Sequence, residues 1–185
     1  MPRTQAFVAV ASATCLVVVK HASMLNVSMR NIRSAMPWFV LSAIVIVLDL
    51  YTKHLIQQAF VYGEHVPVTG FFDLVRYHNT GAAFSFLANA GGWQHGFFTA
   101  VSTLASVVMV YLLVKYPQKT LFCFAIALVL GGALGNLYDR LTLGYVVDFL
   151  LFYYEQWAWP AFNVADSAIC VGVAMLVLDS FKNPG

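Results

Sequence analysis

The sequence has few charged residues. Lysine and arginine number 10, and aspartate and glutamate 8, so charged residues make up 10% of the 185. An ordinary soluble domain has about a quarter. Hydrophobic residues make up 61%, and the mean hydropathy is +0.76. This composition excludes a soluble globular domain and indicates an integral membrane protein. The net charge of +2 is too small to indicate a nucleic-acid partner.

Metal-binding and disulfide patterns are also missing. Cys15, Cys123 and Cys170 each lie in an apolar run without CxxC spacing, which favours small buried hydrophobic residues. No HExxH motif occurs, and the five histidines are scattered along the chain. We therefore expect no metal ion and no other cofactor.

Four apolar segments are long enough to cross a bilayer, which takes about 20 helical residues. They cover residues 37–60, 92–114, 120–138 and 160–181. The predicted fold is an all-α membrane protein, a four-helix transmembrane bundle with a small extracytoplasmic β-cradle and a surface helix. Residues 37–181 form this four-span domain, and residues 182–185 form a cytoplasmic tail.

Residues 1–36 fit the bundle poorly. The apolar run at 6–19 is too short for a span and is closer to the core of a signal sequence. Thr14 ahead of Cys15 makes a poor lipidation motif. We expect a dispensable extension, with translation starting at an internal methionine as an open alternative.

Two segments between the spans are expected at the membrane surface. Residues 61–86 alternate around Pro67 and Gly70, which predicts a short β-hairpin whose edge could pair with an extended substrate. A plain connector is the alternative. Residues 144–159 are crowded with aromatic side chains around Glu155, which predicts a short helix lying on the membrane. That helix would be either a simple anchor or a movable lid.

Several polar residues stand at helical spacing within the apolar segments. Asp49, Thr52 and Lys53 share one face of the first span. The third span ends with a similar face, and the fourth begins with one; these comprise Asn136, Asp139, Arg140, Asn163 and Asp166. Ionisable residues inside a membrane are costly and commonly functional. A purely structural Asp49–Lys53 pair that pins the bundle is the alternative for the first face.

The basic residues predict the orientation. Arginine and lysine gather before the first span, between the second and third, and after the fourth; these are Arg30, Arg33, Lys115, Lys119 and Lys182. By the positive-inside rule, both termini are cytoplasmic. The polar faces then converge on the outer side of the membrane.

Asp148 and Asp166 are the strongest candidates for chemistry. Two carboxylates that share a site do not both ionise easily, so one can act as an acid while the other activates water. A nucleophilic Ser85 activated by Lys53 is a weaker alternative. A small proton-coupled transporter is the alternative from another functional class, although the chain has no inverted repeat.

Five motifs, in this order and spacing, resemble the lipoprotein signal peptidase (signal peptidase II) family. They are Asp49-x-x-Thr52-Lys53, Asn79-x-Gly81-Ala82-Ala83-Phe84, Gly131-Gly132-Ala133-x-Gly135-Asn136-x-x-Asp139-Arg140, Val146-Val147-Asp148-Phe149 and Phe162-Asn163-x-Ala165-Asp166. The resemblance covers about 37–178. The GxGD motif of the presenilin and prepilin aspartyl proteases is absent.

The resemblance implies a multi-pass aspartic endopeptidase of the bacterial inner membrane. Such an enzyme removes signal peptides from diacylglyceryl-modified prolipoproteins, cutting before the lipidated cysteine at the periplasmic face. Membrane lipids and globomycin-type inhibitors are the other implied partners. It implies Asp148 and Asp166 as the catalytic pair, and as substrate-binding or supporting residues Asp49, Lys53, Asn79, Gly81, Asn136, Asp139, Arg140 and Asn163.

Overall fold

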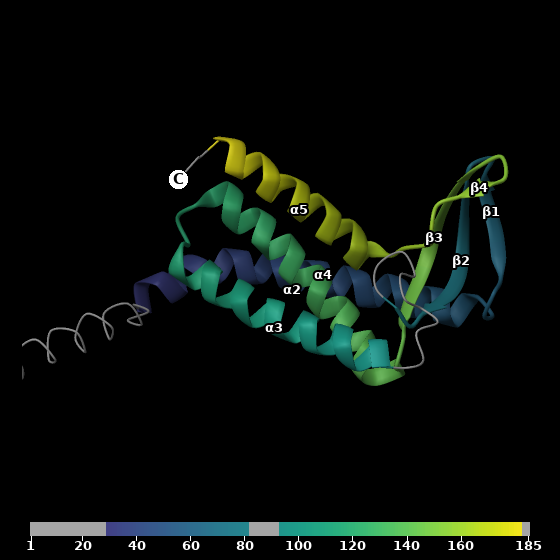
Figure 1. Cartoon of the computed structure of the whole chain (residues 1–185), viewed down its shortest axis with the longest axis horizontal. Coiled ribbons are helices and arrows are strands. Elements are labelled where there is room, and N and C mark those ends of the chain that lie inside the picture. The colour runs from purple at the N-terminus through teal and green to yellow at the C-terminus, as the bar shows by residue number, and fades with distance from the viewer. Residues whose placement is uncertain (1–28, 82–92, 183–185) are drawn as a thin grey trace, which may run out of the picture.

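The computed structural model describes residues 29–81 and 93–182, and within them four long helices run side by side (Figure 1). These are α2 (Met29–Ala59), α3 (Trp93–Lys115), α4 (Thr120–Leu143) and α5 (Val164–Lys182). All four are long and apolar enough to span a membrane. The predicted four-helix transmembrane bundle is therefore confirmed.

Helix α4 lies at the centre of the bundle and packs against α2, α3 and α5. Within its most apolar stretch 56% of the residues are buried, against 17–22% in the other helices. Small residues allow the close contact with α5, because a Cβ on Gly132 would lie only 2.3 Å from the backbone oxygen of Ala165. Packing of this kind is how helices associate in lipid, where burial of apolar surface gives little driving force.

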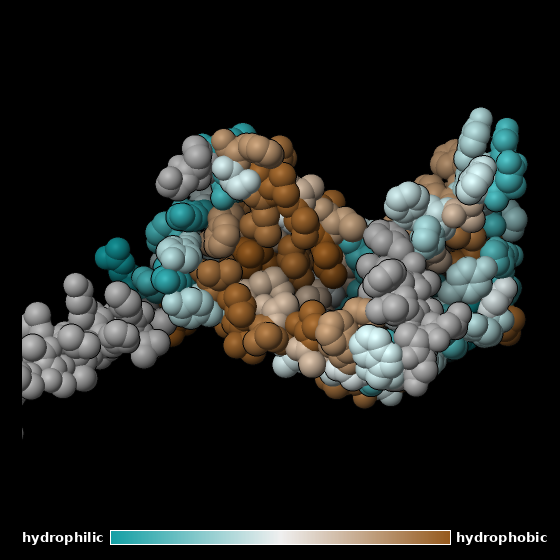
Figure 2. All heavy atoms as spheres, in the orientation of Figure 1, coloured by the Kyte–Doolittle hydropathy of each residue, from teal (hydrophilic) through white to brown (hydrophobic). Residues whose placement is uncertain are grey.

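The outer faces of the helices are hydrophobic. Figure 2 shows hydrophobic residues covering the helical part, whereas hydrophilic residues gather on the sheet and at the opposite ends of the helices. Exposed Val40, Val47, Leu104 and Val173 belong to this surface. A band of apolar surface between two polar ends is what a bilayer requires.

A four-stranded antiparallel sheet lies beyond one end of the bundle, in the order β1-β2-β3-β4 (Figure 1). Strands β1 (His65–Thr69) and β2 (Phe72–Asn79) form the hairpin expected within 61–86. Strand β3 (Val146–Tyr154) pairs with β2, and the short β4 (Trp157–Ala158) pairs with β3. The alternative of a plain connector is wrong for residues 61–81, the part of this segment that the structure describes.

The prediction of a surface helix at 144–159 is also wrong. This segment forms β3 and β4, and Phe152 lies opposite Phe72 of the hairpin. Its run of Val, Phe and Tyr suits a pleated surface, and pairing with β2 satisfies its backbone groups. Because β1 and β3 flank the same strand, the segment is not a separate lid that moves against the hairpin.

The helix ends differ from the expected bounds. Helix α2 begins eight residues before Pro37, which lies inside it, and α4 continues five residues beyond Tyr138 to a cap at Gly144 in the left-handed conformation (φ 81°). Helix α5 begins at Val164 and not at Pro160. Hydropathy marks the part of a helix that lies in lipid, and polar turns can extend the helix at either end.

Candidate active site

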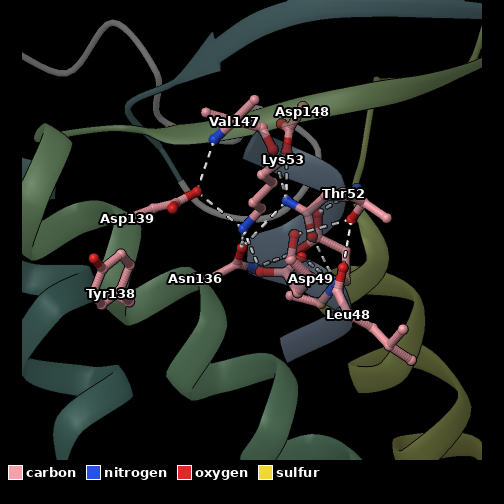
Figure 3. Close-up of polar contacts among 12 residues, drawn as sticks. Leu48, Asp49, Thr52, Lys53, Asn136, Tyr138, Asp139, Val147 and Asp148 are labelled. Carbon is pink, nitrogen blue, oxygen red and sulfur yellow. Dashed lines mark hydrogen bonds and ion pairs between the residues drawn. The ribbon is translucent and has the colours of Figure 1, made fainter. Parts of the chain in front are cut away.

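The structure brings the predicted site residues together where the helices meet the sheet (Figure 3). The polar ends of α2 and α4, the start of α5 and the facing ends of β2 and β3 supply them. All are buried, and none of their polar side chains is more than 7% exposed. They comprise Asp49, Lys53, Asn79, Gly81, Asn136, Asp139, Arg140, Asp148, Asn163 and Asp166.

Asp148 lies on β3, opposite Tyr77 of β2. Asn79 Nδ2 donates to its Oδ2 at 2.9 Å, and Asn163 Nδ2 donates to its Oδ1 at 2.8 Å. Burial and, to a smaller extent, the nearby carboxylate of Asp166 together raise the pKa of Asp148 to about 7. Asp148 is therefore a carboxyl group that can hold a proton at neutral pH.

Asp166 belongs to the first turn of α5 and forms a reciprocal cap with Asn163. The Asp166 amide donates to Asn163 Oδ1 at 2.9 Å, and the Asn163 amide donates to Asp166 Oδ2 at 3.3 Å. Asn136 Nδ2 donates to Asp166 Oδ1 at 2.8 Å. The sequence forms this capping box because Asn and Asp, three residues apart, accept the free amides of a helix start.

The Asn163 side chain contacts both aspartates, Asp148 through its carboxyl group and Asp166 through its backbone amide. Its amide nitrogen donates to Asp148, and its amide oxygen accepts from the backbone of Asp166. One side chain thus fixes the separation and relative orientation of the two aspartates. The arrangement matches the paired carboxylates that the sequence predicts.

A buried lysine lies in a cluster of polar side chains next to the two aspartates. Lys53 Nζ lies 2.7 Å from Asp49 Oδ2 and 3.0 Å from Asp139 Oδ2, and it donates to Asn136 Oδ1 at 2.8 Å (Figure 3). With its oxygen occupied by Lys53, Asn136 must turn its amide nitrogen toward Asp166.

The two partners of Lys53 also hold the backbone around the aspartates. Asp49 Oδ1 accepts from the Ala165 amide at 2.9 Å, at the start of α5. Asp139 Oδ2 accepts from the Val147 amide at 3.1 Å, next to Asp148. The Lys53 cluster therefore joins α2 and α4 to the backbone next to both aspartates.

Arg140 holds the segment that follows β2. Its guanidinium donates to Gly81 O at 2.9 Å and to Asn136 O at 3.3 Å. The Gly81 amide in turn donates to Asn79 Oδ1 at 2.9 Å, which leaves Asn79 Nδ2 directed at Asp148. Arg140 acts on the aspartate through this chain of contacts.

Some expectations lie outside the described residues, namely Ala82, Ala83, Phe84 and the proposed Ser85–Lys53 pair. Sequence reasoning missed His95, which hydrogen-bonds the Arg140 carbonyl at 2.9 Å. It also treated His65 as one of several scattered histidines. The hairpin register places His65 opposite Val75, within reach of Tyr77, and an explicit strand alignment could have found this.

A cavity of about 450 Å³ opens beside Asp148. It extends along the sheet past Tyr77 and His65, and Trp159 also lines it. Within the part of the chain that the structure describes, no three His, Cys, Asp or Glu side chains are grouped to hold a metal ion. The described residues thus offer two adjacent carboxyl groups next to an open space, an arrangement suited to acid–base hydrolysis.

The chain is similar to known proteins over most of its length. The family described as signal peptidase (SPase) II matches residues 41–182. The lipoprotein signal peptidase of Ralstonia nicotianae is 54% identical over 146 residues, covering 79% of this chain and 84% of that protein. The lipoprotein signal peptidase of Janthinobacterium sp. is 49% identical over 152 residues, covering 82% and 92%.

A solved structure agrees with this. A bacterial membrane enzyme determined by the in meso method at 2.3 Å superposes with a TM-score of 0.72 at 28% identity, covering 80% of this chain and 90% of that one. The alternative of a proton-coupled transporter is not supported. These matches point to a peptidase.

Proposed function

Because the chain belongs to the signal peptidase II family, we propose that it is an aspartic endopeptidase that removes signal peptides from prolipoproteins. Its substrates carry a diacylglyceryl group on the cysteine, and the cut falls directly before that cysteine. The observation that carries this proposal is the pairing of Asp148 and Asp166 through the single side chain of Asn163.

The two carboxyl groups have different roles in the proposed reaction. Asp148, with its pKa raised to about 7 by burial and by Asp166, supplies the proton. Asp166 accepts two N–H groups and lies at a helix start, where the partial positive charge favours an anion. It is the group that acts as the base.

In the first step Asp166 takes a proton from a water molecule as the water oxygen attacks the scissile carbonyl carbon. Asp148 gives its proton to the carbonyl oxygen, so the tetrahedral intermediate is neutral. In the second step the carbon–nitrogen bond breaks, and the proton on Asp166 passes to the leaving amine. The carbonyl oxygen returns its proton to Asp148, and the products are a new carboxyl end and the free amine of the cysteine.

We place the protein in the bacterial inner membrane. The ends of the four helices that lie opposite the sheet then face the cytoplasm. Arg30, Arg33, Lys115, Lys119 and Lys182 belong to that end of the bundle, as the positive-inside rule requires. The site then faces the periplasm. Membrane lipids surround the apolar helix faces, and globomycin-type inhibitors occupy the site.

The test uses the purified protein in detergent and a lipidated precursor with a single cysteine. We expect a product shortened by the signal peptide, no product from Asp148→Asn or Asp166→Asn, and inhibition by globomycin. Asp179→Asn, on α5 but far from the site, is the matched control and retains activity. Substantial cleavage by either site variant would refute the assignment of the pair.

A further inference from the structure

The cavity beside Asp148 belongs to the sheet and not to the bundle. Its walls come from the connection before β1, from β1, β2 and β3, and from residues 158–161. No residue of the four described helices lines it. Its volume of about 450 Å³ lies within the range of small-ligand pockets, about 300–1,000 Å³.

Two residues that line the cavity, His65 and Tyr77, form a chain of polar contacts with Asp73, which lies behind the lining. His65 Nδ1 lies 3.5 Å from Asp73 Oδ2, and His65 Nε2 is hydrogen-bonded with the Tyr77 hydroxyl. We assign the ring hydrogen of His65 to Nδ1, the nitrogen on the side of the Asp73 carboxylate. Nε2 is then an acceptor, so the Tyr77 hydroxyl donates to it, and the phenolic oxygen keeps its lone pairs for a partner in the cavity.

Tyr77 stands next to the proposed acid. Tyr77 and Asp148 are direct cross-strand partners, and both line the cavity. Side chains of such partners lie on the same face of a sheet, with their Cβ atoms about 5 Å apart. Tyr77 therefore lies in the same cavity as the carboxyl group that acts on the bond that is cut.

Only one part of the substrate fits this position. The signal peptide and the two acyl chains both belong to the bilayer, whereas the polypeptide after the cysteine must leave it. A cavity lined only by the sheet and its connections lies on that exit path. We propose that it binds the residue following the lipidated cysteine, and that the Tyr77 oxygen, positioned by His65, selects a side chain that donates a hydrogen bond. This proposal rests on the proposed function.

Part of the cavity wall is apolar. Leu151, Ala158 and Ala161 give it an apolar surface. A serine would fit and donate to Tyr77, an alanine would fit without the hydrogen bond, and an aspartate would set its carboxylate against the lone pairs of the phenol. The expected order of preference is therefore serine, alanine, aspartate.

The test compares three lipidated precursors that differ only in this residue. For the unmodified enzyme we expect kcat/KM to be about 5-fold higher with serine than with alanine, the factor that one net hydrogen bond provides, and lowest with aspartate. In Tyr77→Phe the serine-to-alanine ratio falls to about one. A ratio measured on one preparation does not depend on how much of the enzyme is folded.

Two further variants identify the cause. Tyr154→Phe is the matched control, since Tyr154 is exposed near the end of β3 and does not line this cavity; it keeps the ratio of the unmodified enzyme. His65→Phe, which leaves the Tyr77 hydroxyl without its acceptor, lowers the ratio. His65→Gln restores an acceptor oxygen and with it the ratio.

The outcomes separate this proposal from the proposed function. If the unmodified enzyme cleaves all three precursors and Asp148→Asn cleaves none, the peptidase assignment stands. A serine preference that persists unchanged in Tyr77→Phe, or that is absent from the unmodified enzyme, then overturns the subsite alone. If the unmodified enzyme cleaves no precursor, both proposals fail.

Discussion

Replacing Asp148 with asparagine should abolish cleavage and yet stabilise the protein above neutral pH. Burial and the Asp166 carboxylate raise the pKa of Asp148 from 3.8 to about 7 in the folded state. Between these values the folded protein holds a proton that the unfolded chain has lost. The stability of the unmodified protein therefore falls as pH rises through this window.

The magnitude follows from the two pKa values. At 1.36 kcal/mol per pKa unit, the shift from 3.8 to about 7 costs the folded state roughly 4 kcal/mol at pH 8 but only about 1.5 kcal/mol at pH 5. Asn79 and Asn163 both donate to Asp148, and an asparagine has one acceptor for them. The lost hydrogen bond costs about 1–3 kcal/mol at either pH.

Asp148→Asn should therefore be about as stable as the unmodified protein at pH 5 and roughly 2 kcal/mol more stable at pH 8. Unfolding in detergent micelles from pH 5 to pH 8 measures the difference. Glu155→Gln, which removes an exposed carboxylate between β3 and β4, is the control. A difference that stays constant with pH, or shrinks, would show that folded Asp148 is already ionised and cannot be the acid.

Three other changes probe the support of the site. Lys53→Met leaves Asp49 and Asp139 buried without their cation, and we expect a loss of roughly 3–5 kcal/mol in the free energy of unfolding, together with loss of cleavage. Arg140→Lys keeps the charge but cannot hold both Gly81 O and Asn136 O, so the free energy of unfolding should fall by roughly 1.5 kcal/mol for the lost charged hydrogen bond, and kcat/KM should fall because Asn79 is no longer held against Asp148. Deleting residues 1–28 keeps Arg30 and Arg33 and should leave both membrane insertion and cleavage intact.

The bundle could be predicted from the sequence because a bilayer leaves few choices. Long apolar runs must form helices there, since every backbone group needs a partner within the segment. The ends were less predictable. Helix α2 runs through Pro37 to Met29, because its polar first turns lie beyond the hydrocarbon, where hydropathy gives no signal.

The strands at residues 146–158 could not be recognised locally. A run such as Val146–Tyr154 is apolar throughout, and its periodicity does not separate a buried strand from an interfacial helix. Pairing with the hairpin makes this segment a strand, since Tyr77 and Asp148 are paired although they are far apart in the chain. The sequence of either segment alone does not show that the two strands pair.

That these polar side chains lie together could be predicted, but the pattern of their hydrogen bonds could not. Charged and amide side chains in apolar segments stand out, and the ordered motifs selected the same positions. Which atom bonds which follows from geometry. The Asn163 side chain contacts both aspartates, and the Lys53 cluster extends to the backbone amides of Val147 and Ala165, which the sequence cannot specify.

The last prediction concerns Gly135, where a methyl group should disable the site without touching either aspartate. A Cβ at this position would lie 2.6 Å from Asp49 Oδ2. That carboxylate cannot swing aside freely, because it is held by Lys53 at 2.7 Å and by the Ala165 amide at 2.9 Å. Gly135→Ala must therefore break one of these contacts, and we expect a loss of about 1–3 kcal/mol in the free energy of unfolding and a marked fall in cleavage.

Two comparisons show whether the effect passes through Asp49. Gly96→Ala, in α3, adds the same methyl group where no atom lies within 4 Å, and it should leave stability and cleavage unchanged or slightly raise stability. In an Asp49→Ala background, the methyl group of Gly135→Ala meets no carboxylate. The double variant should therefore have almost the same free energy of unfolding as Asp49→Ala alone, so the effects of the two changes are strongly non-additive. If their effects on unfolding simply add, the methyl group acts through helix packing and Asp49 is not the contact that requires glycine.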